Sequence, residues 1–182
     1  HHVPYDSSWM RDNGPVFVEE GGKIIAQDWG FNAWGGRFGS DIPYYLDDKV
    51  PEYVAGYLDI PLESVDVVHE RGNLEFNGAG ALIVNWSAIG DSARNPRYTK
   101  QRAEGDLKHW FGVNKVIFID GVPEGDRTNG HIDGIARFIS PDKVAVTQCT
   151  KASLCSVSDP TGLIFEKAAE KIREAGFTVV RD

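Results

Sequence analysis

The sequence predicts an α/β fold made of three copies of one unit, in which two strands around a turn are followed by a helix and a third strand. The turns near Gly21, Ala79 and Pro141 are 58 and 62 residues apart. The composition, 41% hydrophobic and 25% charged, is that of a globular chain. Three such units would leave sheet edges uncovered, so we expect a partial propeller. Periodicity alone also allows an ordinary α+β domain with similar hairpins.

Each copy follows the same order of elements. The first is expected to have strands at 15–19 and 23–29, a helix at 51–58 and a strand at 65–69. The second is expected to have strands at 74–77 and 81–86, a helix at 98–111 that stops at Gly112, and a strand at 115–119. The third is expected to have strands at 132–139 and 143–147, a helix at 160–175 and a strand at 177–180. Residues 1–182 are thus predicted to form a single incomplete propeller domain, with repeats of approximately 12–69, 70–120 and 131–181.

Charge and apolar content limit the function classes. The net charge of −8 opposes binding to nucleic acid or to an anionic membrane and favours a small cationic ligand. No apolar run approaches the roughly 20 residues that span a bilayer, and the sequence indicates a cytoplasmic protein. Cys149 and Cys155 lie six residues apart with no nearby histidine, so we expect neither a disulfide nor a zinc site, and a reducing compartment.

Polar residues recur at the same interval as the turns. Asp12, Glu70 and the pair His131 and Asp133 stand just before or at the start of each hairpin, with 58 residues from Asp12 to Glu70 and 61 from Glu70 to His131. Pseudosymmetry would bring them to a common axis. His131 and Asp133 are expected on an extended run, where alternate residues point to the same face.

These residue types suit a guanidinium ligand. Two carboxylates, Asp12 and Asp133, can bind the planar cation along its N–H edges, while His131 moves protons and Glu70 orients His131. A thiolate nucleophile would complete a hydrolytic reaction but is unassigned. Each residue also has a plainer reading: Asp12 as a turn former, Glu70 in a surface ion pair with Arg71, and His131 with Asp133 as a core pair or a metal fragment.

Five motifs carry a family resemblance. They are SWMRDNGP at 8–15, WGFNAWGG at 29–36, ERGN at 70–73, RNP at 94–96 and GHID at 130–133. In this order they resemble agmatine deiminases of the bacterial-type peptidylarginine deiminase family, over nearly the whole chain. The resemblance implies a five-bladed α/β propeller with an axial active site, no metal and no organic cofactor. It also implies that Asp12 and Asp133 hold the guanidinium, that His131 is the acid/base and that Glu70 supports His131.

The sequence departs from the family pattern in ways that bear on catalysis and substrate. The family's nucleophilic cysteine lies in a glycine-rich segment near the end of the last blade, which this sequence lacks, and Cys149 and Cys155 do not match it; the chain alone is expected to be inactive. Arg127 and Asn129 replace acidic residues before the GHID motif, and Arg71 adds a further cation. If Arg127 points inward, like-charge repulsion disfavours a substrate with an amine tail and favours one with a carboxylate, such as arginine.

The remaining motif residues are assigned more simply. Trp9 and Trp34 either pack against the alkyl chain of the substrate or belong to the core. The Arg94-Asn95-Pro96 segment is expected to cap the following helix. The predicted activity is hydrolysis of agmatine to N-carbamoylputrescine and ammonia, or of an arginine-type substrate, through a cysteine thiouronium intermediate. The alternatives are a non-catalytic guanidinium or polyamine binding module and an amidinotransferase. Apart from the small cationic substrate, the partners left open are a second copy of the chain and the missing C-terminal segment.

Overall fold

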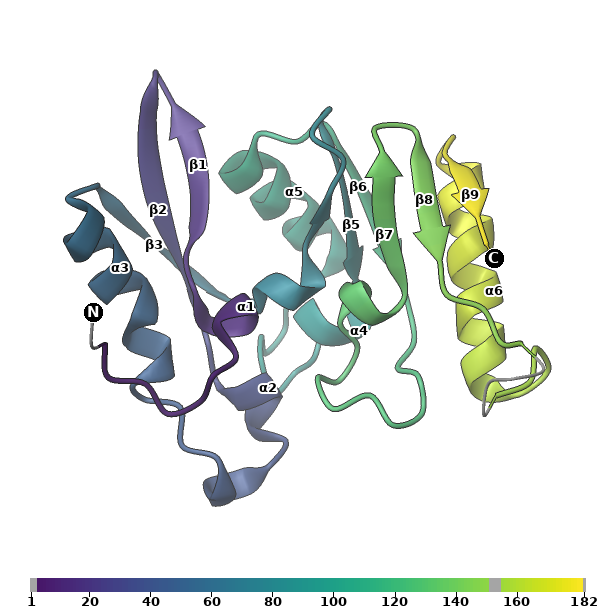
Figure 1. The fold of residues 1–182 in the computed structure, drawn as a ribbon, viewed down its shortest axis with the longest axis horizontal. Helices are drawn as coiled ribbons and strands as arrows, with labels where there is room; N and C mark the ends of the chain where they lie inside the picture. The colour runs from purple at the N-terminus through teal and green to yellow at the C-terminus, as the bar shows by residue number, and fades with distance from the viewer. Residues whose placement is uncertain (1–2, 151–154, 182) are drawn as a thin grey trace. The chain divides into compact units, whose positions relative to one another are not determined.

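The computed structural model describes residues 3–150 and 155–181. The chain divides into two compact units, the first containing His1–Arg71 with Asp91–Arg97, and the second containing Gly72–Gly90 with Tyr98–Asp182. Among the described residues there are three mixed sheets, each of three strands (Figure 1). In every sheet an antiparallel hairpin is followed by a strand parallel to the second strand of the hairpin. The predicted α/β class is confirmed.

The first unit contains the first sheet. Strands β1 (Val16–Glu20) and β2 (Lys23–Gly30) turn at Gly21 and Gly22, whose φ values of +57° and +79° favour glycine. Helix α3 (Val50–Leu58) packs against β2 and against β3 (Leu62–Val68). The predicted helix is therefore confirmed to within one residue. Short elements complete the unit: α1 (Met10–Asn13), α2 (Ala33–Gly36), η1 (Gly39–Asp41) and η2 (Asp47–Lys49).

The second unit begins with the second sheet. Its strands are β4 (Glu75–Phe76), β5 (Ala81–Asn85) and β6 (Lys115–Ile119), preceded by the turn η3 (Arg71–Asn73) at the boundary of the units. All residues of β5, the central strand, are buried. Two helices follow β5: α4 (Trp86–Ile89) and α5 (Lys100–Phe111). As predicted, α5 ends at Gly112, which adopts a left-handed conformation.

The cap of α5 differs from the prediction. The Thr99 side chain accepts a hydrogen bond of 3.2 Å from the backbone N–H of Arg102. This threonine, rather than the Arg94-Asn95-Pro96 segment, is the N-cap. The expected capping role of that segment is wrong, because it belongs to the first unit and bonds there.

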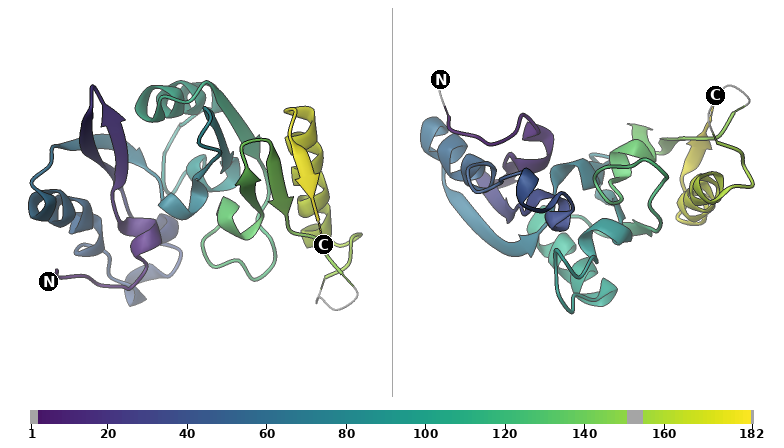
Figure 2. Two further views of the ribbon diagram at one scale, coloured as in Figure 1. Left: turned by 45° about the horizontal axis from the view of Figure 1, so that its top comes forward. Right: turned by 90° about the horizontal axis from the view of Figure 1, so that it is seen from below.

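The third sheet also lies in the second unit. It contains β7 (Ala136–Ser140), β8 (Lys143–Val146) and β9 (Thr178–Val180), with α6 (Pro160–Glu174) connecting β8 to β9. Helix α6 runs along this sheet and also contacts β6 (Figure 2). It buries an apolar face spaced at helical intervals against the strands: Phe165, Ala168, Ala169 and Ile172.

The start of the third hairpin is not extended as predicted. Residues Ile132–Gly134 form the 3-10 turn η4, and the strand begins only at Ala136. His131 and Asp133 therefore do not lie on one face of a strand, and the alternation argument for them is wrong. The reason is a competing hydrogen bond from a residue distant in sequence: the backbone N–H of Ile132 donates to the Asn73 side chain at 3.2 Å instead of joining a sheet ladder.

The cysteines also differ from the prediction. Cys149 and Cys155 form a disulfide, with their Cα atoms 5.3 Å apart. The spacing of the two cysteines, six residues apart, did not reveal this pairing. Both cysteines of the chain are thus paired and neither is a free thiol.

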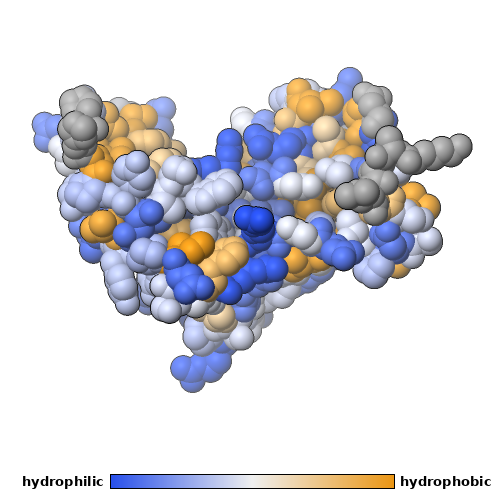
Figure 3. Space-filling model, turned by 60° about the horizontal axis from the view of Figure 1, so that its bottom comes forward, coloured by the Kyte–Doolittle hydropathy of each residue, from blue (hydrophilic) through white to orange (hydrophobic). Residues whose placement is uncertain are grey.

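The surface drawn in Figure 3 intersperses hydrophilic and apolar residues. No helix within residues 3–150 and 155–181 has the length and apolar character needed to cross a membrane.

Candidate active site

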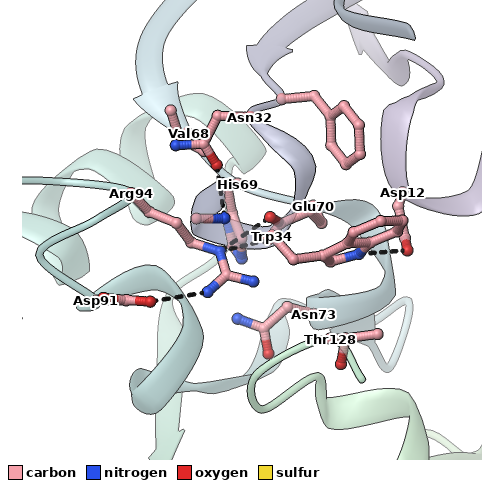
Figure 4. Close-up of polar contacts among 12 residues, drawn as sticks. Asp12, Asn32, Trp34, Val68, His69, Glu70, Asn73, Asp91, Arg94 and Thr128 are labelled. Carbon is pink, nitrogen blue, oxygen red and sulfur yellow. Dashed lines mark hydrogen bonds and ion pairs between the residues drawn. The ribbon is translucent and has the colours of Figure 1, made fainter. Parts of the chain in front are cut away.

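Asp12 is buried in the short helix α1, with 3% of its surface exposed. Its carboxylate oxygen Oδ2 accepts a hydrogen bond of 3.0 Å from the indole N–H of Trp34 (Figure 4). Its backbone carbonyl accepts a second, of 3.1 Å, from the guanidinium of Arg71. The chain leading into α1 is fixed as well, since the Asp47 carboxylate accepts from the backbone N–H groups of Asp6 and Ser7. The aspartate is therefore oriented by the fold rather than held in a mobile turn.

Trp34 reaches Asp12 from an unusual backbone turn. Four successive residues, 33–36, have φ between +54° and +77°. For a residue with a side chain this left-handed conformation costs roughly 1–2 kcal/mol. Asn32 stabilises the turn, because its Oδ1 accepts from the backbone N–H of Gly35 at 2.8 Å and its Nδ2 donates to the carbonyl of Ala93 at 3.0 Å. The strained backbone of this turn, stabilised by Asn32, thus places the indole of Trp34 at a defined position.

The two tryptophans proposed from sequence lie together. The ring of Trp9 meets that of Trp34 edge to face, with centroids 6.3 Å apart. Trp34 is 4% exposed and also packs edge-on against Phe31 and Phe38, so most of its surface is used within the unit. Trp9 is 58% exposed and remains accessible to a ligand.

Glu70 is fully buried and forms an ion pair that the sequence did not predict. Both carboxylate oxygens accept from Nε of Arg94, at 2.9 and 3.0 Å (Figure 4). The same guanidinium donates from Nη1 to Asp91 at 3.2 Å. Neither the Glu70 nor the Arg94 side chain is exposed. The proposed surface pair with Arg71 is therefore wrong.

Arg71 instead holds backbone. Its guanidinium donates to the carbonyl oxygens of Asp12, His69 and Trp29 at 2.9 to 3.1 Å. Burial lowers the pKa of Arg71 to about 10, partly opposed by nearby Asp28 and Glu70, so the side chain is still cationic at neutral pH. This arginine ties α1 to the ends of β2 and β3.

His131 and Asp133, in the second unit, line one cavity. The cavity has a volume of about 290 Å³ and is also bordered by Glu124, Asp126 and Thr128. His131 is 3% exposed, whereas Asp133 is half-buried. The structure therefore brings this base and this carboxylate to the same cavity, although not by the strand alternation expected. Within the described ranges, no group of three or more His, Cys, Asp or Glu side chains could hold a metal ion.

The loop before His131 is organised by Asp126. One carboxylate oxygen accepts from the backbone N–H and the hydroxyl of Thr128, at 2.8 and 2.7 Å. The other accepts from the backbone N–H of Gly130 at 2.6 Å. The Thr128 hydroxyl in turn accepts from the backbone N–H of His131 at 3.1 Å. Arg127 lies in this loop but is exposed and is absent from the lining of the cavity.

Several residues around the site were not recognised as such from sequence. Arg94 and Asn95 stood in a quoted motif but were assigned to a cap, and Asn32 stood in another without a role. Asn73 holds the backbone of Ile132, and Asp126 holds the loop to His131. Except for Asp126, these polar residues stand inside the quoted motifs, which could have drawn attention to them. Their hydrogen-bond partners, however, are up to 61 residues away in the sequence.

The family of the chain follows from comparison with known proteins. It belongs to the Porphyromonas-type peptidyl-arginine deiminase family, which it matches over residues 1–176. A Mycoplasma capricolum protein provisionally named agmatine deiminase is 38% identical over 144 residues, 78% of this chain and 40% of that protein. The chain thus spans about 40% of the length of this curated relative.

Solved structures of agmatine deiminases have a fold similar to that of this chain. A cysteine-to-serine variant of C. jejuni agmatine deiminase with substrate bound is 30% identical, with a TM-score of 0.83 over 95% of this chain and 50% of that one. The agmatine deiminase of Enterococcus faecalis is 28% identical, with a TM-score of 0.81 over 95% of this chain and 48% of that one.

Proposed function

We propose that the protein to which this chain contributes hydrolyses the guanidino group of a small cationic substrate, releasing ammonia and leaving a ureido product. The observation that carries the proposal is the buried Asp12 carboxylate, oriented by Trp34. The cavity lined by His131 and Asp133 and the agmatine deiminase names of the relatives support it. With agmatine the product is N-carbamoylputrescine, a precursor of putrescine.

The proposed roles follow from the chemistry of the residues. Asp12 and Asp133 accept hydrogen bonds from the guanidinium, as planar N–H edges favour. A thiolate attacks the guanidinium carbon and forms a C–S bond; the C–N bond breaks, and His131 protonates the departing ammonia. His131 then takes a proton from water, and the hydroxide adds to the thiouronium carbon. The C–S bond breaks as the hydroxyl proton passes to the released ammonia, which gives the ureido product, ammonium and the regenerated thiolate. Glu70 orients His131. The reaction as proposed uses no metal or organic cofactor.

We infer that the thiolate comes from outside this chain, and the pairing of its two cysteines with each other supports this inference. We infer that the three sheets are blades of a five-bladed propeller whose axis carries the site. In this view residues 1–182 form one incomplete domain with repeats of about 12–69, 70–120 and 131–181. The three sheets of equal topology support this view. A cytoplasmic location is part of the same proposal.

The substrate tail is the finer question. We infer that Arg127 lets the protein accept a guanidino compound with a carboxylate, such as arginine, beside agmatine only if its side chain, which is exposed and does not line the cavity of His131 and Asp133, turns towards the bound substrate. The test is ammonia release by the complete protein from agmatine, arginine and peptidylarginine, for the wild type and for Arg127→Glu. We expect Arg127→Glu to shift preference towards agmatine. An unchanged preference would reject the charge argument for Arg127 but not the proposed hydrolysis of a guanidino group.

The same assay separates the other functions. Release of ammonia that is lost in His131→Ala supports hydrolysis. Binding of agmatine without turnover by the complete protein would indicate a binding module instead. Transfer of the amidino group to a labelled acceptor amine, without ammonia release, would indicate an amidinotransferase.

A further inference from the structure

The segment Asp91–Arg97, here called the brace, belongs to the first unit although the residues on either side of it belong to the second. Its Asn95 side chain bonds Val68 at the end of β3 twice, accepting from the backbone N–H at 3.0 Å and donating to the carbonyl at 2.8 Å. The Asn95 side chain thus makes the two backbone hydrogen bonds that a neighbouring strand would make to Val68. It anchors the brace two residues before Glu70.

The brace also meets the left-handed turn that carries Trp34. Asn32 donates to the carbonyl of Ala93 at 3.0 Å. A methyl group on Gly35 would lie 3.2 Å from Oδ2 of Asp91 and 3.3 Å from Cβ of Ala93. A side chain at this position would therefore require the brace to shift by a few tenths of an ångström.

The result of these contacts is the position of Arg94. Its Nε lies between the two carboxylate oxygens of Glu70, at 2.9 and 3.0 Å, and its Nη1 lies 3.2 Å from Asp91. Both side chains of the Glu70–Arg94 pair are completely buried. Breaking such a pair on one side leaves an uncompensated buried charge, so the geometry and the charge of Glu70 depend on Arg94.

We propose that Arg94 is a positioning residue of the active site: through the brace it fixes the orientation and the ionised state of the Glu70 carboxylate without contacting the substrate. The inference rests on the proposed role of Glu70 as the carboxylate that supports the acid/base histidine. Arg71 also lies near Glu70, and Asp28, Asp12 and Asp48 lie near Arg71; Asp91 accepts from Arg94. The hydrogen bonds of Arg71 go to backbone carbonyls. Arg94 is therefore the arginine whose hydrogen bonds orient the Glu70 carboxylate.

The test compares Arg94→Gln, Arg94→Lys and Glu70→Gln in the complete protein, by steady-state kinetics on agmatine across pH. For Arg94→Gln we expect kcat to fall by about a hundredfold with KM nearly unchanged. We also expect the acid limb of the kcat profile to move up by about one to three pH units, because the carboxylate has lost its counter-charge. Arg94→Lys keeps the charge but not the two-oxygen contact, so it should lower kcat with a smaller shift of the limb.

The control is Arg97→Gln, since Arg97 lies in the same segment but is exposed. It should leave both kcat and the pH profile as in the wild type. A wild-type kcat and profile in folded Arg94→Gln, beside an inactive Glu70→Gln, would overturn the inference. If Arg94→Gln does not fold, a wild-type kcat in Arg94→Lys overturns it equally. Full activity of Glu70→Gln would instead reject the proposed role of Glu70 itself.

Discussion

The hydrogen bond from Trp34 to Asp12 determines how the proposed clamp carboxylate presents its oxygens. The indole N–H donates to Oδ2 at 3.0 Å, which holds this oxygen of the carboxylate in a defined direction. A tryptophan buried among Phe31 and Phe38 can supply this fixed donor because its ring cannot turn away. Trp34 is thus a core residue, and its indole N–H also orients the carboxylate proposed to bind the substrate.

Replacing Trp34 by phenylalanine removes the N–H but keeps an aromatic ring in the core. We expect KM for the guanidino substrate to rise about tenfold, with a smaller change in kcat, because a hydrogen bond to a charged group contributes about 1.5–3 kcal/mol. Steady-state kinetics of the complete protein would measure this. Trp110→Phe in α5, which has no assigned role, is the matched control; an equal rise in both variants would speak against the orienting bond.

Among the elements, the left-handed turn at 33–36 is disfavoured by local propensity, because two of its residues with side chains, Ala33 and Trp34, have positive φ. Of its two glycines, Gly35 packs against the brace, whereas a methyl group on Gly36 would meet nothing within 4 Å. Both have positive φ, +77° and +67°. The pair can therefore separate backbone strain from packing.

Gly35→Ala and Gly36→Ala should both lower stability, since each places a side chain at positive φ, at about 1 kcal/mol. We expect Gly35→Ala to cost a further 1 kcal/mol or more, roughly, because the brace must move. Urea unfolding of the two variants, with equal m-values, provides the comparison. Equal losses in the two variants would show that the brace does not press on the turn.

The N-cap of helix α6 leads us to expect that the stability of the fold depends on pH. Asp159 is its N-cap and accepts from the backbone N–H of Gly162, which with Ser156 holds the pKa of the carboxyl below its ordinary value of 3.8. A depressed folded pKa gives stability that is present above the unfolded value and is lost as pH falls through the folded one. Asp159→Asn caps equally well but does not titrate. The melting temperatures of the two proteins should be similar near pH 7, and that of the wild type should fall more steeply below pH 4. Parallel plots of melting temperature against pH would contradict this prediction.

The elements were predictable from sequence where the pattern is local. The helices over 51–58, 98–111 and 160–175 and the strand over 115–119 agree with α3, α5, α6 and β6 to within two residues. The turn η4 was missed because Asn73, outside the strand pattern, accepts from the backbone N–H of Ile132. The disulfide was missed because two cysteines six residues apart, outside any periodic pattern, do not by themselves indicate that they pair.

At the scale of the whole molecule, what sequence could not supply is pairing over distance. Glu70 and Arg94 are 24 residues apart, and Asp12 and Trp34 are 22 apart. Each of the four residues was visible in a motif, but only the fold assigns Arg94 to Glu70 and Trp34 to Asp12. Spacing did anticipate that three sheets recur at a constant interval, because each copy repeats the same local pattern.

The most direct test of the proposed chemistry is the fate of the guanidino carbon. Agmatine and arginine, labelled with ¹³C at that carbon, are incubated with the complete protein and followed by NMR. We predict that the guanidino signal of at least one of them is replaced by a ureido carbonyl signal with one equivalent of ammonia, and that Asp12→Asn and Asp133→Asn each abolish the conversion. A folded complete protein that yields no ureido product from either compound, or that retains full turnover in both variants, would contradict the account.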